Sequence, residues 1–371
     1  MMRWERATVE ATLGGWTGVA RLQVRSGEES LRALAYDHLT GCPEVGEQVL
    51  LNTNALRRGL GTGGDALVVA RPDVDPQDLP APTGEGHMVK LRYTPVQVMV
   101  DAVDDPASTH HAVMQRAEGI DGMPVVVADL HSSVPAIVAG VRADRPTARI
   151  AYVHTDGASL PAAYSRSIGA LREHGLLEAC ISAGQAFGGD LEAVTLHSAL
   201  LAARHVVEAD VAVAVQGPGN LGSGTGWGFS GIEAAEALHA AAALGGRPVA
   251  TLRVSDADPR PRHRGLSHHS ATTYGRATFT PVILPVLGPT DARYSPFHAR
   301  VWEQLEFAVV EPGVSRGVEH IVREVAAEGL DGALRSLPVR LSTMGRGLDE
   351  DPSAFLYAAL AGRAAAEFLE P

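Results

Sequence analysis

Cysteine is almost absent from this sequence, whose 371 residues include only two, Cys42 and Cys180. Two cysteines cannot form a disulfide framework or a cysteine-based zinc site. No apolar run is as long as a membrane span, and the first ten residues lack the apolar centre of a signal peptide. We therefore expect a cytoplasmic protein that does not bind membranes.

Positive charge is also scarce. The chain has 31 Lys and Arg residues against 43 Asp and Glu residues, which gives a formal net charge of -12 at pH 7. Proteins that bind nucleic acids meet the phosphate backbone with a basic surface, so we expect no nucleic-acid partner. The remaining composition, with 45% hydrophobic and 20% charged residues, is ordinary for a globular protein. The length allows two or three domains.

Residues 1–83 show the pattern of a small N-terminal β-barrel. Short, partly alternating segments such as VARLQV and LRALAY are separated by clusters of Gly, Ser and Pro. The segment CPEVGEQV resembles the Pro-x-Val-Gly turn of small barrels, in which the glycine permits a tight bend. Residues 71–86 are rich in Pro, Asp and Gly and predict a linker. We therefore place a domain boundary between residues 83 and 84.

Residues 84–371 alternate between apolar runs and helix-period runs. The apolar runs PVVVADL, ARIAYV, LEACISA, VAVAV, PVATLRV and TPVILPV predict buried strands. The last part of the chain, including VSRGVEHIVREVAAEG at residues 314–329, is expected to be mostly helical. Repeated β-α units predict an α/β fold, with a doubly wound, mainly parallel sheet and helices on both faces. Ligands of such folds bind at the carboxyl ends of the strands.

A glycine-rich loop follows the strand predicted at residues 211–215. A strand, such a loop and a helix, in that order, place backbone N–H groups around an anion. The loop matches Gly-x-Gly-x-x-Gly, but it lacks the later acidic residue of dinucleotide sites and the lysine of a P-loop. We therefore assign no cofactor. A tight packing corner is the alternative; the candidate ligand-binding residues are Gly217, Gly219, Asn220, Gly222, Ser223, Gly224 and Thr225.

A second candidate stretch is SDADPRPRHRGLSHHS, residues 255–270. It follows a predicted strand, so we expect it at the same edge of the sheet. Arg262 or Arg264 is predicted to bind a phosphate or carboxylate through two N–H groups of its planar guanidinium. His268 or His269 is predicted to act as an acid or base. The alternative is that this stretch is a solvent-exposed loop without a functional role.

Metal binding is another possible use of the same stretch. Its carboxylates and imidazoles are suitable ligands for zinc or a related ion. Their spacing matches no common zinc pattern. The alternative metal-ligand set is Asp256, Asp258, His263 and His268, with His269 as a further possible ligand.

Two further candidate catalytic residues follow other predicted strands. Asp156 comes after the strand ARIAYV, and His131 comes after PVVVADL. Carboxylates and imidazoles at such strand ends often orient or activate a substrate. A simple turn explains Asp156 equally well.

Four segments resemble a known family when they are taken together: TDGASLPAAYS, AFGGDLEAV, QGPGNLGSGTGWGFSG and DADPRPRHRGLSHHS. They are similar to a family of bacterial proteins defined only as a domain of unknown function. The resemblance extends along most of the chain. It implies no activity, substrate or catalytic residue.

The residues favour an enzyme that acts on a small anionic, phosphorylated metabolite by hydrolysis or group transfer. One alternative is a metal-dependent hydrolase that uses the His/Asp cluster at 256–269. Another is a non-enzymatic ligand-binding sensor or regulatory protein. Alanine-rich helices predicted at residues 232–244 and 353–369 indicate a homo-oligomer, or equally close packing on their own sheet.

Overall fold

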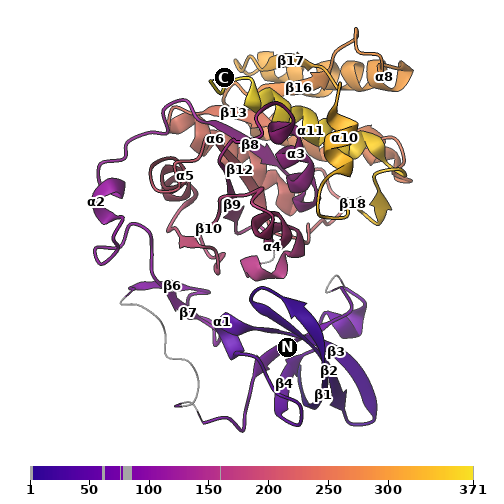
Figure 1. Ribbon diagram of the computed structural model, residues 1–371. Coiled ribbons are helices and arrows are strands. Elements are labelled where there is room, and N and C mark those ends of the chain that lie inside the picture. The colour runs from indigo at the N-terminus through magenta and orange to yellow at the C-terminus, as the bar shows by residue number, and fades with distance from the viewer. Residues whose placement is uncertain (1–2, 61–62, 76, 78–85, 159, 371) are drawn as a thin grey trace. The chain divides into compact units, whose positions relative to one another are not determined.

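The computed structural model describes residues 3–60, 63–75, 77, 86–158 and 160–370. The chain divides into two compact units, Met1–Asp101 and Ala102–Pro371 (Figure 1). The predicted boundary between residues 83 and 84 lies outside the described residues.

The first unit contains a closed five-stranded barrel, as the sequence predicts. Its strands pair in the order β1-β2-β3-β5-β4. They are β1 (Trp4–Trp16), β2 (Val19–Ser26), β3 (Glu29–Tyr36), β4 (Gln48–Asn52) and β5 (Ala66–Ala70). The described residues of this unit also form α1 (Asp37–Thr40), η1 (Leu56–Arg58), β6 (Met88–Lys90) and β7 (Val98–Val100).

The barrel is held together by side chains that alternate along its strands. Val9, Leu22, Val24, Val49 and Leu51 are fully or almost fully buried in one apolar cluster. In a strand every second side chain points to the same face, so this alternation fills the barrel interior. The turn before β4 contains a glycine at position 46 with a φ of 95°, a left-handed conformation that favours glycine.

The second unit is built on an eight-stranded, all-parallel sheet, which confirms the predicted α/β fold. The strand order is β11-β10-β9-β12-β8-β13-β16-β17. The strands are β8 (Pro124–Ala128), β9 (Ile150–Thr155), β10 (Ala179–Ser182), β11 (Leu191–Glu192), β12 (Val211–Gln216), β13 (Arg247–Ala250), β16 (Ile283–Leu287) and β17 (Ile321–Val325). Two small antiparallel pairs lie outside it: β14 (Val254–Ser255) with β15 (Gly265–Leu266), and β18 (Ser342–Thr343) with β19 (Arg346–Gly347).

Helices cover both faces of the sheet (Figure 1). The chain runs in one direction through β8, β9 and β10 and returns through β12 and β13, so right-handed crossovers put α3 and α4 on one face and α5 and α6 on the other. The α-helices are α2 (His111–Met114), α3 (Val134–Asp144), α4 (Arg166–Glu173), α5 (Leu196–His205), α6 (Ala234–Ala243), α7 (His268–Thr272), α8 (Pro296–Leu305), α9 (Glu311–Val314), α10 (Leu330–Arg335) and α11 (Pro352–Ala366). Shorter turns are the 3-10 segments η3 (His131–Ser133), η4 (Ala162–Tyr164), η5 (Ser230–Glu233) and η6 (Pro261–His263), and the π-helical η7 (Thr273–Ala277) and η8 (Glu306–Val310).

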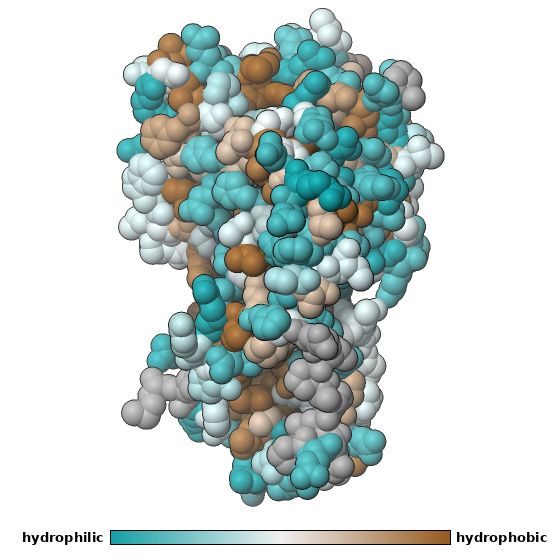
Figure 2. Space-filling view, turned by 90° about the vertical axis from the view of Figure 1, so that its left-hand side faces the viewer, coloured by the Kyte–Doolittle hydropathy of each residue, from teal (hydrophilic) through white to brown (hydrophobic). Residues whose placement is uncertain are grey.

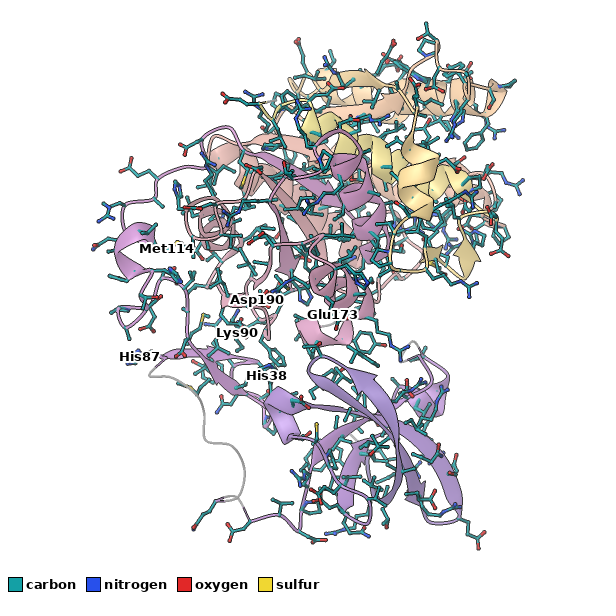
Figure 3. All side chains as sticks on the ribbon, viewed as in Figure 1. His38, His87, Lys90, Met114, Glu173 and Asp190 are labelled. Carbon is teal, nitrogen blue, oxygen red and sulfur yellow. The ribbon has the colours of Figure 1, made fainter. Side chains whose placement is uncertain are left out.

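The core of the second unit lies between the sheet and these helices (Figure 3). The alanine-rich helices α6 and α11 contribute to it: most of their side chains are buried against the sheet, and α11 also packs on α3. The helices α3 and α11 approach closely at two glycines. A Cβ at Gly140 would meet the carbonyl of Ala359, and one at Gly362 would meet the carbonyl of Ile137.

The expectation that residues 314–329 are mostly helical is wrong, because Ile321–Val325 forms the edge strand β17. Four of its five side chains are exposed or half-buried, and two of these, Arg323 and Glu324, are charged. An edge strand has only one neighbour and tolerates charge, so it lacks the apolar run that marks the central strands.

The described helices include none that is both long and apolar enough to cross a bilayer. On the face of the second unit drawn in Figure 2, hydrophobic residues are scattered among hydrophilic ones. Such scattered apolar residues are normal at a protein surface.

Candidate functional site

The fold places a crevice at the carboxyl end of strand β12. Its neighbours β8 and β9 continue into helices on one face, whereas β12 continues into α6 on the other. Ligands of parallel sheets bind where the connections diverge in this way. The crevice is spanned by Gln216, whose Nε2 donates to the carbonyl oxygen of Asp129 at 2.7 Å.

The glycine-rich loop after β12 forms a small hairpin over this edge. Ser223 N donates to Gly228 O at 2.7 Å, and Ser230 N donates to Leu221 O at 2.9 Å. The Thr225 hydroxyl accepts from Gly228 N at 3.1 Å. The hairpin, residues 221–230, therefore fills much of its hydrogen-bonding capacity internally.

The base of the hairpin is fixed to the end of β8. Asn220 Nδ2 donates to the carbonyl oxygen of Asp129 at 3.2 Å, and Asn220 Oδ1 accepts from the Ser230 hydroxyl at 2.9 Å. A Cβ at Gly231 would lie 2.8 Å from the Cβ of Asp129, so only glycine allows this approach. The ring of Phe229 stacks on His269 at 3.9 Å between ring centroids, which joins the hairpin to α7.

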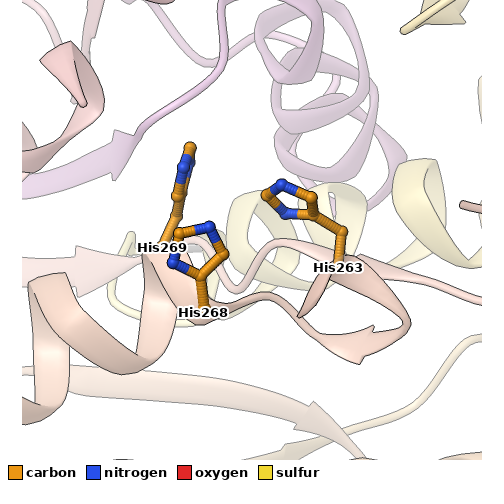
Figure 4. A group of neighbouring side chains, drawn as sticks. All are labelled: His263, His268 and His269. Atoms are coloured by element: carbon orange, nitrogen blue, oxygen red, sulfur yellow. The ribbon is translucent and has the colours of Figure 1, made fainter. Parts of the chain in front are cut away.

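The predicted stretch 255–270 reaches the same edge through β14, η6 and β15. Its serine at position 267 caps α7, because the Ser267 hydroxyl accepts from His269 N at 3.2 Å. The same hydroxyl lies 2.8 Å from His263 Nδ1. One short turn therefore positions His263, His268 and His269 around a common space (Figure 4).

A cavity of about 190 Å³ lies between the hairpin and this stretch. Three arginines and three histidines line it together with residues of the glycine loop, so the structure brings the two predicted stretches together. The lining residues are Leu130, Asn220, Leu221, Gly222, Gly224, Thr225, Gly228, Arg253, Arg260, Arg262, His263, His268, His269 and Met344.

A buried carboxylate supports this cavity from the end of β8. Asp129 Oδ2 lies 3.2 Å from His269 Nδ1 and 3.3 Å from Arg253 Nη1, and the latter two atoms are 2.9 Å apart. Burial alone would raise the pKa of Asp129, but the hydrogen bond with His269 and the charge of Arg253 outweigh it, so its pKa lies below the usual value. Asp129 is therefore a stable anion that orients both neighbours.

Two of the three histidines are neutral at physiological pH. Burial lowers the pKa of His263 to about 3, with a further contribution from the charge of Arg253. Burial also lowers the pKa of His268 to about 4, with contributions from His269 and Arg262. Neutral imidazoles can accept a proton or bind a metal ion.

The aspartates of the predicted metal-ligand set lie elsewhere. Asp258 is buried and accepts two hydrogen bonds from the guanidinium of Arg260, at 2.9 and 2.8 Å, and pairs with Arg346 at 3.2 Å. Asp256 is exposed. Among the described residues, the group of three or more side chains placed to hold a metal ion consists of His263, His268 and His269.

The remaining predicted ligand-binding residues lie at or beyond the rim. Arg264 is exposed and is not among the residues that line the cavity. Gly217 is buried and Gly219 is exposed with a φ of 104°, and neither lines the cavity. Ser223 is exposed on the hairpin, where its hydroxyl contacts that of Thr225 at 3.0 Å.

His131 faces β9 rather than the cavity. Its Nδ1 lies 3.2 Å from the carbonyl of Gln216, which can only accept, so Nδ1 carries the proton. Its Nε2 then accepts from the Ser165 hydroxyl at 2.7 Å. Burial lowers the pKa of His131 to about 3, so the ring is a neutral link between the end of β12 and the start of α4.

Asp156 also lies on the β9 side of the crevice. It is exposed, and its Oδ2 accepts from Gln185 N at 3.0 Å. It stands near Glu233, a half-buried carboxyl group at the start of α6. Burial raises the pKa of Glu233 to about 7. The charge of Asp156 adds to this rise, and a hydrogen bond with Thr155 opposes it.

Sequence reasoning missed Asp129 and Arg253. Asp129 directly follows a buried strand, which is the same signal that identified Asp156, so the sequence does contain a clue to it. Arg253 lies within the segment PVATLRV, which was assigned to a strand. The strand β13 ends at Ala250, and this leaves the arginine at the edge of the sheet.

Comparison with known proteins identifies a family but no activity. No curated protein and no solved structure matches the chain. Residues 32–362, nearly the whole chain, match the profile of a family described as "Protein of unknown function (DUF3866)", and this confirms the family resemblance in the sequence: the chain belongs to that family.

Proposed function

We propose that the protein is an enzyme that binds a small phosphorylated metabolite in the cavity between the hairpin and residues 253–269. The observation that carries the proposal is the lining of this cavity. Three arginines and three histidines converge there in a protein whose formal net charge is -12. A volume of about 190 Å³ suits a compact metabolite, because drug-sized ligands occupy roughly 300 Å³ or more.

Arg262 is the arginine best suited to bind the anion. Arg260 is held by Asp258, and Arg253 is shared with Asp129. Among the described residues, Arg262 makes no hydrogen bond or ion pair, and its side chain lines the cavity. A free guanidinium can offer two parallel N–H donors to a phosphate group.

The reaction that fits these groups is hydrolysis or transfer of the phosphoryl group. In hydrolysis, the oxygen of water forms a bond to phosphorus and the ester P–O bond breaks. One proton of the water passes to a base, and the leaving oxygen takes up a proton. A histidine of the cavity can take up this proton, or a metal ion bound by the histidines can activate the water.

Ligand binding to matched arginine variants tests the proposal. Thermal unfolding of the full chain is measured with inorganic phosphate and a panel of phosphate monoesters, each with added Zn²⁺ and with a chelator, and phosphate release is assayed in parallel. A ligand at 100 times its Kd stabilises the folded protein by about 2.7 kcal/mol. We expect this stabilisation to be lost in Arg262→Ala and kept in Arg264→Ala, an exposed arginine outside the cavity lining.

Two results would overturn the proposal. One is the absence of stabilisation by every phosphorylated compound in the wild type. The other is equal loss in the two variants, which would indicate a general charge effect. Binding without turnover of any ester would overturn the enzymatic part of the proposal and favour a sensor.

The predicted homo-oligomer stays a prediction. The alanine-rich helices that suggested it, α6 and α11, bury most of their side chains within the second unit.

A further inference from the structure

Three imidazole rings share one end of the cavity (Figure 4). One nitrogen from each of His263, His268 and His269 lies within 4.8 Å of the others. In a tetrahedral zinc site with Zn–N bonds of about 2.0 Å, ligand nitrogens are about 3.3 Å apart. The three rings would therefore have to move closer together for their nitrogens to bind one ion at this distance.

The hydrogen bonds behind two of the rings fix their orientation. His263 Nδ1 lies 2.8 Å from the Ser267 hydroxyl, and His269 Nδ1 lies 3.2 Å from Asp129 Oδ2. When Nδ1 carries the proton, it donates to these oxygens and Nε2 keeps its lone pair. Metal-binding histidines usually donate their second N–H to a carboxylate, carbonyl or water in this way.

Arg253 competes with the metal-binding tautomer of His269. Its Nη1 can only donate and lies 2.9 Å from His269 Nδ1 and 3.3 Å from Asp129 Oδ2, so as placed it favours Nδ1 as an acceptor. Metal binding through Nε2 requires the proton on Nδ1, and Arg253 then donates to Asp129 alone. Asp129 therefore acts as an outer partner that holds His269 in place.

The charges around the rings indicate what else the ion would bind. No carboxylate belongs to the group of three, so a divalent ion there would keep a net charge of about +2. Arg260 is neutralised by Asp258, and Arg262 lines the cavity near the rings. The remaining positive charge favours an anion or a water molecule as the fourth ligand.

We propose that His263, His268 and His269 bind one divalent transition-metal ion, zinc by ligand type, with a coordination position open to the cavity. The metal site adds to the proposed function. It rests on that function only for the fourth ligand, which would be a phosphate oxygen of the substrate. An ion at this place would polarise the phosphoryl group or activate the attacking water. Of the possible metal ligands named from the sequence, the site uses the three histidines, His263, His268 and His269, and neither Asp256 nor Asp258.

Metal binding is measured without any phosphorylated compound. Untagged full-length protein is stripped with a chelator and dialysed against Zn²⁺ or Co²⁺, and bound metal is quantified by mass spectrometry. We expect one equivalent of Zn²⁺, and visible absorption bands of nitrogen-ligated Co²⁺. His268→Ala should weaken binding by more than about 100-fold, whereas His174→Ala, an exposed histidine at the end of α4, should leave it unchanged.

A change to the outer partner adds a graded test. Asp129→Asn should weaken metal binding by about 10- to 100-fold without abolishing it, because Asn can still accept a hydrogen bond from His269. Circular dichroism of each variant checks that the fold is intact; if His268→Ala is misfolded, His268→Gln takes its place.

The two proposals fail in different ways. Less than about 0.1 equivalent of bound metal, or unchanged binding in a folded His268 variant, would overturn the metal site. Phosphate binding in chelator that depends on Arg262 would then still support the proposed function. Conversely, stoichiometric metal with no response to any phosphorylated compound would support the ion and reject the phosphorylated substrate.

Discussion

Glu233→Gln is expected to make the protein more stable, and by an amount that depends on pH. Glu233 stands at the start of α6, and its pKa is raised from 4.5 to about 7, chiefly by burial. Between pH 4.5 and 7 the folded state therefore binds more protons at this site than the unfolded state does. The stability of the wild type falls as pH rises through this window and is constant above it.

The magnitude follows from the size of the pKa shift. Each unit corresponds to about 1.4 kcal/mol, so the ionised carboxylate costs at most about 3 kcal/mol above pH 7. The partial exposure of the side chain reduces this value. Glutamine has the same shape and can still bond to Thr155, but it carries no charge, so the variant avoids the cost.

Thermal unfolding at a series of pH values tests the reasoning. We expect the two proteins to melt together at pH 4.5 and the variant to melt roughly 5 °C higher at pH 8. Glu236→Gln, at an exposed glutamate on the same helix, is the matched control and should give no such trend. A gap between wild type and Glu233→Gln that is independent of pH, or that closes as pH rises, would refute the argument.

Two further predictions concern packing and a buried ion pair, and calorimetry or thermal unfolding checks both. Gly362→Ala should destabilise the protein by about 1–3 kcal/mol, because the new Cβ would meet the carbonyl of Ile137. Gly169→Ala in α4, where a Cβ meets nothing within 4 Å, should be neutral or stabilising by up to about 1 kcal/mol; equal effects would contradict the packing argument. Asp258→Asn should cost roughly 2–4 kcal/mol, because it leaves two arginines without their buried carboxylate. Asp349→Asn removes an exposed pair and should cost less than about 1 kcal/mol; a larger loss there would reverse the expected order.

The layout of the fold is readable from the sequence because the central strands are buried on both faces. Runs such as VAVAV and PVVVA contain almost only small apolar residues, and the loops between them carry the polar groups. Parallel strands end at one edge of the sheet, so the glycine loop and residues 255–270 could be expected to meet. The edge strand β17 was not predicted because two charged residues interrupt its apolar sequence.

The details of the site were less accessible. A glycine-rich segment permits an anion-binding loop and a hairpin equally well, and only the hydrogen bonds of Ser223 and Ser230 distinguish them. The second partner of Asp258 could not be found from the sequence either, because Arg346 is 88 residues away in the chain. Contacts of that separation depend on the whole topology rather than on local spacing.

The hairpin at residues 221–230 can change in sequence independently of the rest of the site. Its backbone hydrogen bonds are made within the hairpin. The flanking residues Asn220 and Gly231 contact Asp129 at the end of β8. Substitutions or length changes at its tip would therefore reshape the roof of the cavity without disturbing the sheet or the histidines beneath it. The tip of the hairpin is therefore the part of the cavity wall where substitutions should change the shape of the cavity with the least effect on folding.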